Sequence, residues 1–158
     1  MQNNIAVLLP YKDQFIKDNA GSASIWVKDF SKDSKLKKNT TIFGYTSNIS
    51  KTFDNFNYVN LKFSNFGVQS KNLKYVNKFI DVLNRKKFSL IEIHNRPSYI
   101  LHIEKNLPNQ KYILVIHNNP QTLRGAVTPK ERKHLIKLCS KITFVSNWVK
   151  EKFFEGLD

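Results

Sequence analysis

Short apolar runs alternate with longer stretches in which apolar residues recur at helical spacing, along the whole chain. The short runs are bounded by turn-forming residues and predict strands. These runs cover residues 5–9, 40–43, 58–63, 90–93, 112–116 and 142–145. The longer stretches predict helices. The first predicted helix begins at Ser22 or Ser24, the second covers residues 71–87, and the third begins at Pro97. The fourth runs from Pro129 to about Cys139, and the fifth from Ser146 to near Gly156.

The alternation of strands and helices predicts the fold class. Core strands that read as nearly continuous apolar runs are typical of a parallel sheet covered by helices. We therefore predict an α/β, Rossmann-like, doubly wound fold, with a mainly parallel sheet and helices on both faces, over a single domain of residues 1–158. Thr128 and Glu131 form a capping-box pattern with Pro129 between them, and Ser146 is predicted to cap the last helix.

Composition and charge narrow the class of protein further. The chain has 158 residues, of which 26 are basic and 12 acidic, so its formal net charge is +14. Lysine supplies 22 of the basic residues, and 18 asparagines accompany them, a joint excess that biased genomic base composition produces. We interpret most of the charge as solvated surface, and we expect no specific nucleic-acid partner because the chain lacks a DNA- or RNA-reading motif.

Cysteine content and apolar segments bear on the compartment. Cys139 is the only cysteine, so a disulfide scaffold is excluded. No apolar run approaches the ~20 residues that a membrane-spanning helix needs, and the N-terminus lacks a signal-peptide pattern. We expect a cytoplasmic protein.

The stretch at residues 71–87 combines an apolar stripe with many cations. One interpretation is a surface helix that packs its stripe onto the sheet, and the other is a helix beside anionic lipid on the inner face of the cytoplasmic membrane. Both hold if only the basic rim meets lipid. The cations concerned are Lys71, Lys74, Lys78, Arg85, Lys86 and Lys87.

Polar residues follow several of the predicted strands. Open α/β sheets bind ligands outside the carboxyl ends of their strands. We therefore expect the loops that carry Gly21, His94, His117 and Ser146 to meet around one hollow. The candidate ligand-binding residues are Gly21, Ser22, His94, Asn95, Arg96, His117, Asn118, Arg124 and Ser146.

Each type of candidate also has a structural interpretation. Gly21 permits either a tight turn or the approach of a phosphate or sugar at a helix N-terminus. His94 suits either a buried hydrogen-bonded role or a ligand, whereas His117 favours function because it follows four apolar strand residues. Asn95, Asn118 and Asn119 also suit capping of the helices begun by Pro97 and Pro120, and the arginines suit anion binding. Glu92, within a strand, is assigned no role.

Several motifs of other enzyme classes are absent. The chain has no G-x-G-x-x-G turn for a dinucleotide, no P-loop, no G-x-S-x-G elbow, no Asp-x-Asp pair and no zinc-ligand cluster. We therefore expect neither a bound metal nor a tightly held cofactor.

Four stretches at the predicted loops resemble a known family. They are residues 18–24, 93–97, 116–120 with 124–125, and 139–150. In this order they resemble the N-terminal domain of a family 4 retaining glycosyltransferase, which has the GT-B architecture. The likeness extends over essentially the whole chain. It departs from the family at Ala20, where a glycine pair is common, and in the missing second domain with its Glu-x7-Glu segment.

The resemblance implies two Rossmann-like domains facing a cleft, the first receiving the acceptor and the second holding a UDP- or GDP-sugar. It places His117 near the transferred sugar, as the catalytic candidate, and Gly21 beside the donor phosphates. The whole enzyme would transfer a sugar with retention, to a cell-envelope glycan or glycolipid, and the isolated domain would be inactive. The alternative is a non-catalytic basic module that binds a phosphorylated ligand or nucleic acid.

Overall fold

The computed structural model describes residues 4–157, which form two compact units, one up to Ser89 and the other from Leu90. The strands are β1 (Ile5–Leu8), β2 (Thr40–Gly44), β3 (Tyr58–Asn60), β4 (Leu90–His94), β5 (Tyr112–Ile116) and β6 (Cys139–Phe144). The α-helices are α1 (Ser22–Lys32), α2 (Lys71–Arg85), α3 (Pro97–Asn106), α4 (Pro129–Leu138) and α5 (Asn147–Phe154). Three short 3-10 helices are η1 (Lys37–Asn39), η2 (Ile49–Lys51) and η3 (Pro120–Thr122).

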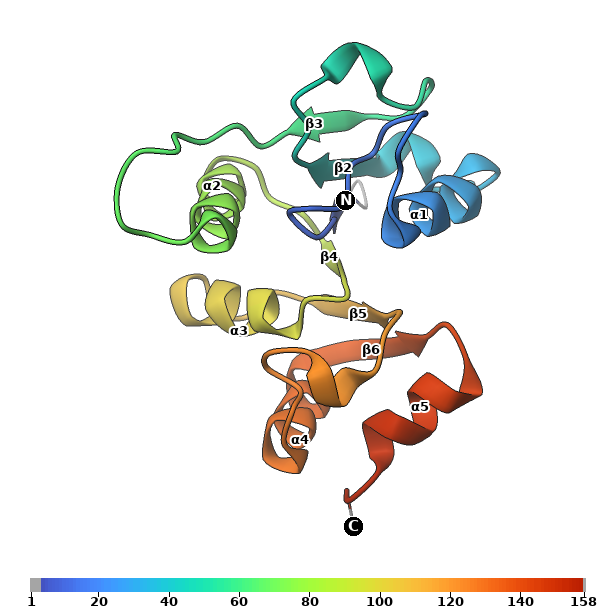
Figure 1. Ribbon diagram of the computed structural model, residues 1–158, viewed down its shortest axis with the longest axis vertical. Coiled ribbons are helices and arrows are strands. Elements are labelled where there is room, and N and C mark those ends of the chain that lie inside the picture. Colours follow the sequence, from blue (N-terminus) through green and yellow to red (C-terminus); the bar gives the residue numbers. More distant parts are fainter. Residues whose placement is uncertain (1–3, 158) are drawn as a thin grey trace. The chain divides into compact units, whose positions relative to one another are not determined.

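The first unit is a three-stranded parallel sheet in the order β3-β2-β1, with α1 on one face and α2 on the other (Figure 1). Strand side chains alternate between the faces. Val7 and Ile42 therefore join the buried cluster that includes Val27 of α1. Phe43, the next residue along β2, contacts Phe79 of α2 with ring centroids 5.1 Å apart. Both faces of this sheet are thus covered.

Helix α2 packs its apolar stripe inside the first unit. Its buried residues are Tyr75, Val76, Phe79, Ile80 and Leu83. The Tyr75 hydroxyl donates a hydrogen bond of 2.8 Å to the carbonyl of Leu9, which ties the helix to the end of β1. Of the two interpretations of this helix, packing of the stripe is confirmed, so only its basic rim is exposed for another partner.

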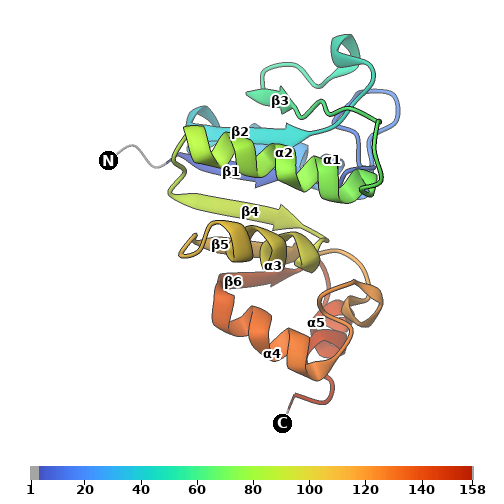
Figure 2. The same cartoon turned by 90° about the vertical axis from the view of Figure 1, so that its left-hand side faces the viewer.

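The second unit is a three-stranded parallel sheet in the order β4-β5-β6. Helices α3 and α4 lie on one face and α5 on the other, as the two views in Figures 1 and 2 agree. Within this unit the strand arrowheads point the same way (Figure 2), so the carboxyl ends of β4 and β5 lie at one edge.

The helix starts in the second unit follow their sequence signals. Thr128 and Glu131 form the predicted capping box, and Ser146 Oγ accepts from Val149 N at 3.2 Å.

Arg132, on α4, is 2% exposed. Its guanidinium donates to the carbonyls of Ala126, Val127 and Glu155, and so joins the loop before α4 to the end of α5.

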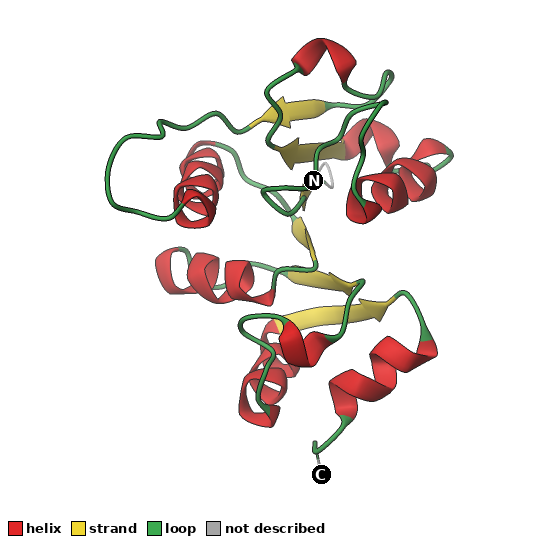
Figure 3. Ribbon diagram, viewed as in Figure 1, coloured by secondary structure: helices red, strands yellow, loops and turns green. Residues whose placement is uncertain are grey.

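The predicted α/β class is confirmed, and each unit, with the strand order β3-β2-β1 or β4-β5-β6, is a parallel, helix-covered sheet of the Rossmann-like kind. Some element ends differ. β3 stops at Asn60 because the chain turns there, with Lys62 N donating to Asn60 O, and a long loop then leads to α2 (Figure 3). β6 begins at Cys139, directly after α4. Among residues 4–157, no helix has the length and apolar character needed to cross a membrane.

Candidate functional site

Two parallel strands bring the candidate histidines together in the second unit. Residue for residue, β4 pairs with β5, so that His94 lies opposite Val115. His94 is the last residue of β4 and His117 is the first residue after β5. His94 Nδ1 lies 3.0 Å from His117 Nε2, within hydrogen-bond distance. His94 is fully buried and His117 is half-buried.

Glu92 extends this pair from inside β4. It lies two residues before His94 and therefore projects from the same face of the strand. Glu92 Oε1 is 2.7 Å from His94 Nε2. His94 thus contacts a carboxylate through one ring nitrogen and an imidazole through the other. The sequence interpretation missed Glu92, although the Glu-x-His spacing on a strand was a usable signal.

Asn95 holds the turn after β5. Its backbone lies in the left-handed region, with φ of 53°, which Asn tolerates better than most residues. Its side-chain oxygen accepts from His117 N at 3.4 Å and from Asn118 N at 3.3 Å, while its own N–H donates to Val115 O. The suggestion that Asn95 caps the helix begun by Pro97 is wrong, because the N-cap residue of α3 is Arg96 and no side chain caps it.

The neighbouring polar candidates have varied roles. Arg96 Nη1 donates to Asn95 O at 2.8 Å, whereas Asn118 and Arg124 are exposed. The carbonyl of Arg124 accepts from Ser98 N at the start of α3. Gly125 follows with φ of 91°, and a Cβ there would lie 2.9 Å from Ser98 N, so a glycine is needed for this close approach.

Ser146 and Asn119 act as caps. The Ser146 hydroxyl caps α5, and Val145 N donates to Ile116 O, which brings this turn beside the end of β5. Asn119 caps η3 by accepting from Gln121 N at 3.0 Å. The capping interpretation is therefore confirmed for Asn119 and wrong for Asn118, which precedes the N-cap residue of η3.

Gly21 and Ser22 lie in the first unit, at the start of α1. Gly21 is the N-cap residue of this helix. The prediction that Ser22 or Ser24 caps it is therefore wrong. The carboxylate of Asp13 takes that role, accepting from Ala23 N at 3.0 Å and from Ser24 N at 3.1 Å. A Cβ on Gly21 would lie 2.4 Å from Asp13 Cγ. The glycine therefore makes room for a carboxylate of the same chain.

The structure thus brings His94, Asn95, His117 and Asn118 together at one sheet edge, as predicted. The meeting of the Gly21 loop with this edge stays a prediction. The contacts made by Glu92, Asp13 and Arg132 were not predicted from the sequence.

Two side chains with raised pKa values lie at the amino ends of β5 and β6, away from the histidine pair. Tyr112 begins β5 and pairs with Cys139, the first residue of β6. Burial raises the pKa of the Cys139 thiol to about 12 and, with Glu104 nearby, raises the pKa of the Tyr112 hydroxyl. Cys139 is therefore a poor nucleophile, because the thiolate is the reactive form.

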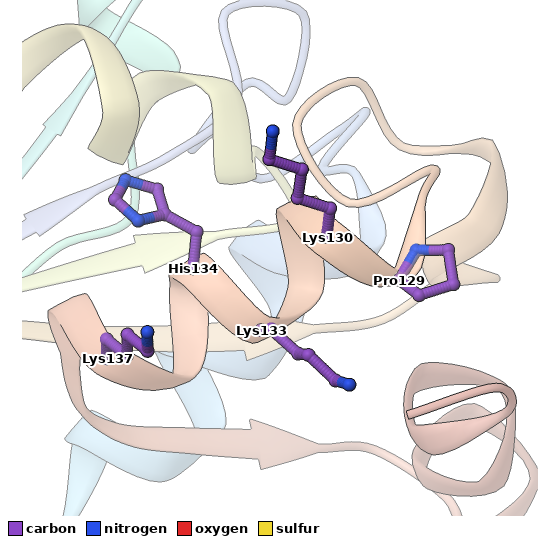
Figure 4. Close-up of a pocket in the computed structure, with 5 residues that line it drawn as sticks. All are labelled: Pro129, Lys130, Lys133, His134 and Lys137. Atoms are coloured by element: carbon purple, nitrogen blue, oxygen red, sulfur yellow. The ribbon is translucent and has the colours of Figure 1, made fainter. Parts of the chain in front are cut away.

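A basic surface hollow of about 450 Å³ lies over α4. Figure 4 shows Lys130 and His134 on one side of the helix, with Lys133 directed to the other. The lining residues are Pro129, Lys130, Lys133, His134 and Lys137, and none of them was a predicted site residue. In the part of the chain that the structure describes, no three His, Cys, Asp or Glu side chains are grouped to hold a metal ion.

Comparison with known proteins gives no match, either to a protein-family model or to the sequence of a curated protein. The fold and the site geometry are therefore the basis for a functional proposal.

Proposed function

We propose that this chain is the N-terminal, acceptor-side domain of a retaining glycosyltransferase with the GT-B architecture. The observation that carries the proposal is the pair of histidines at the ends of β4 and β5, 3.0 Å apart and held by Asn95. The order of the strand-end motifs along an α/β fold supports the same class. In this proposal a second domain, outside the present chain, holds a UDP- or GDP-sugar.

The proposed chemistry is mainly positioning. The strand-end edge places an acceptor hydroxyl against the anomeric carbon of the donor sugar, and preorganised dipoles stabilise the departing diphosphate. His117 donates or accepts a hydrogen bond at the donor sugar or at the charge that develops there. His94, Asn95 and Asn118 shape this edge, while Arg96 and Arg124 supply positive charge beside it.

The reading frame beyond Asp158 provides the first test. We expect about 150–200 further residues with a second α/β pattern and a Glu-x7-Glu segment. In the longer protein, His117→Ala should lower sugar transfer by at least ~100-fold, the scale of one lost stabilising contact. His102→Ala is the matched control, because His102 is a histidine within α3 that lies neither at a strand end nor in the lining of the basic hollow. Undiminished transfer by His117→Ala would remove this residue from the mechanism.

We also propose that the first unit binds an anionic membrane surface through the rim of α2 and the loop before it. Lys71, Lys78, Arg85, Lys86 and Lys87 of this region are exposed. Phe66 and Val68 lie in the loop between β3 and α2 with exposed fractions of 93% and 106%. Lys74, in contrast, donates to the carbonyls of Phe66 and Gly67 and holds the loop against the helix.

Co-sedimentation with vesicles tests the membrane proposal. Binding should require anionic lipid and weaken with salt, since both partners are charged. Replacing Phe66 and Val68 by Ser should reduce binding, whereas Phe30→Ser, at an exposed apolar residue of α1, should not. Equal binding to neutral vesicles would contradict an electrostatic contact.

The basic hollow over α4 favours one second candidate, a non-catalytic module that binds a phosphorylated ligand or nucleic acid. In that case a double Lys130→Ala, Lys137→Ala variant should weaken binding of a phosphorylated probe, such as a short oligonucleotide. A Lys35→Ala, Lys38→Ala variant, with the same loss of charge in the first unit, is the control. Equal losses in both variants would indicate net charge alone.

A further inference from the structure

Three side chains at the end of β4 and β5 form a continuous hydrogen-bonded chain. Glu92 Oε1 is 2.7 Å from His94 Nε2, and His94 Nδ1 is 3.0 Å from His117 Nε2. The Glu92 side chain keeps 21% of its surface exposed, whereas His94 has none. The chain therefore runs from a partly solvated carboxylate, through a fully buried ring, to a half-buried ring at the strand-end edge.

The chemistry of the three groups gives this chain a direction. An ionised carboxylate can only accept a hydrogen bond, so His94 must carry its proton on Nε2. In the neutral ring the other nitrogen, Nδ1, is then an acceptor. His117 must donate to it from Nε2, so His117 also carries a proton on that nitrogen. The carboxylate thus fixes the tautomers of both rings.

The backbone of His117 is held independently of its ring. Asn95 is buried, and its side-chain oxygen accepts from the N–H of His117. The ring of His117 is thus anchored by the last residue of β4, and its backbone by the residue that follows this strand. Such anchoring sets the orientation of a functional side chain more tightly than packing alone.

We propose that Glu92 and His94 are positioning residues for His117: Glu92 sets its tautomer through His94 and compensates positive charge that develops on the two rings. This inference rests on the proposed glycosyltransferase function for its catalytic meaning. The hydrogen-bonded chain itself can be tested without any substrate. Glu92 and His94 contact neither donor nor acceptor in this proposal.

Nitrogen NMR of the histidine rings in this chain is the first experiment. In long-range proton–nitrogen correlation spectra, His94 and His117 should both show the pattern of the Nε2-protonated neutral ring. Glu92→Gln keeps the size of the side chain, but its amide can present either oxygen or NH₂ to His94. We expect His117 to become a mixture of tautomers in this variant. Glu151→Gln, on the exposed surface of α5, should leave the spectra unchanged.

Two results of the NMR experiment would overturn the proposal. One is a His117 ring protonated on Nδ1 in the unaltered chain. The other is a His117 pattern that Glu92→Gln leaves unchanged while the variant stays folded by its amide spectrum.

Kinetics of the longer enzyme test the role in transfer. Glu92→Gln should lower kcat by about 10-fold or more and change KM by less than about twofold, since a wrongly protonated ring loses transition-state contacts. An unchanged kcat in an active enzyme would refute the positioning role and leave the glycosyltransferase proposal intact. A correct tautomer pattern in a protein that transfers no sugar would refute the glycosyltransferase proposal instead, and with it the catalytic meaning of the chain.

Discussion

Asp13 and Gly21 act together at the start of α1. The Asp13 carboxylate accepts from two backbone N–H groups of the first helical turn, in the place where a helix attracts an anion. The absence of a side chain at position 21 gives it room. One carboxylate therefore depends on one glycine, and their energetic contributions should not be independent.

Replacing either residue should cost the capping interactions. We expect Asp13→Ala and Gly21→Ala each to lower the free energy of unfolding by about 1–2 kcal/mol, the usual value of an N-cap. Gly21→Ala should cost little when Asp13 is already Ala, because the clash is then absent. Urea denaturation of the four proteins measures this cycle. Fully additive losses would show that the two residues do not act through the same contact.

Cys139 should be unreactive in the folded chain. Burial raises the pKa of its thiol to about 12. Near pH 9 the fraction of thiolate should therefore be lower in the folded protein than in the unfolded chain by a factor of roughly 100 or more. Alkylation by iodoacetamide should be slow in buffer and fast in urea, as followed by mass spectrometry. Comparable rates in the two solvents would contradict this burial.

The same shift makes a contribution to stability that depends on pH. The folded pKa lies above the ordinary value of 9.0, so the folded state holds the proton more tightly. This contribution is complete below pH 9 and is lost as pH rises from there to about 12. Cys139→Ala should remove this part of the alkaline decline.

At the scale of elements, Arg132 joins the loop before α4 to the C-terminal end of α5. Its guanidinium donates to three backbone carbonyls, and its Nε has no hydrogen-bond partner in the structure. Because the Arg132 side chain is buried, water cannot easily take over its hydrogen bonds to these carbonyls. The second unit therefore depends on a charged side chain where an apolar residue would be the usual occupant.

Arg132→Met should lower the free energy of unfolding by about 3 kcal/mol or more, because it removes three hydrogen bonds made by a buried charged group, each worth about 1.5–3 kcal/mol. Lys130→Met, on the exposed part of the same helix, should change it by less than about 0.5 kcal/mol. Urea denaturation followed by circular dichroism measures both. Equal small changes would show that solvent or repacking satisfies the three carbonyls.

Element types were largely predictable from the sequence, whereas some element ends were not. The apolar run at β5 gave correct bounds, and the capping box located α4. The start of β6 was missed because Ser140 and Lys141 are exposed and polar. The α1 cap was missed because Asp13 lies ten residues away from Ala23 in sequence, beyond the reach of a local signal.

Predictions for the candidate site followed the same division. Parallel topology alone places His94 and His117 at one edge, so their proximity was predictable. The contact between their rings depends on the register of β4 against β5, which no sequence pattern reveals. Glu92 was overlooked because residues after the strands were considered, whereas its carboxylate arises inside one.

For the whole molecule, the dominant property is its charge of +14. The ion pairs in the structure are mostly between exposed side chains, such as Lys17 with Asp54, and such pairs contribute little. Repulsion among the remaining cations should therefore oppose the compact state. Salt screens this repulsion over distances beyond about 10 Å at 0.1 M.

The midpoint temperature of thermal unfolding, Tm, should accordingly rise with added salt. We expect Tm to increase by several degrees between about 0.02 and 0.3 M sodium chloride, as the Debye length shortens. Sucrose at matched osmolality is the control for effects that do not involve charge. A Tm that falls with salt would show that attraction between opposite charges outweighs the repulsion.

The alternation of side chains along β4 also limits how this stretch of chain can change in length. Insertion of one residue between Glu92 and His94, or deletion of Ile93, would send the carboxylate to the opposite face of the sheet. Insertion of two residues would restore its side but would lengthen the separation of the two residues by about 7 Å, which breaks the contact between carboxylate and ring. Natural variants that retain this contact should therefore keep a single residue between the two side chains.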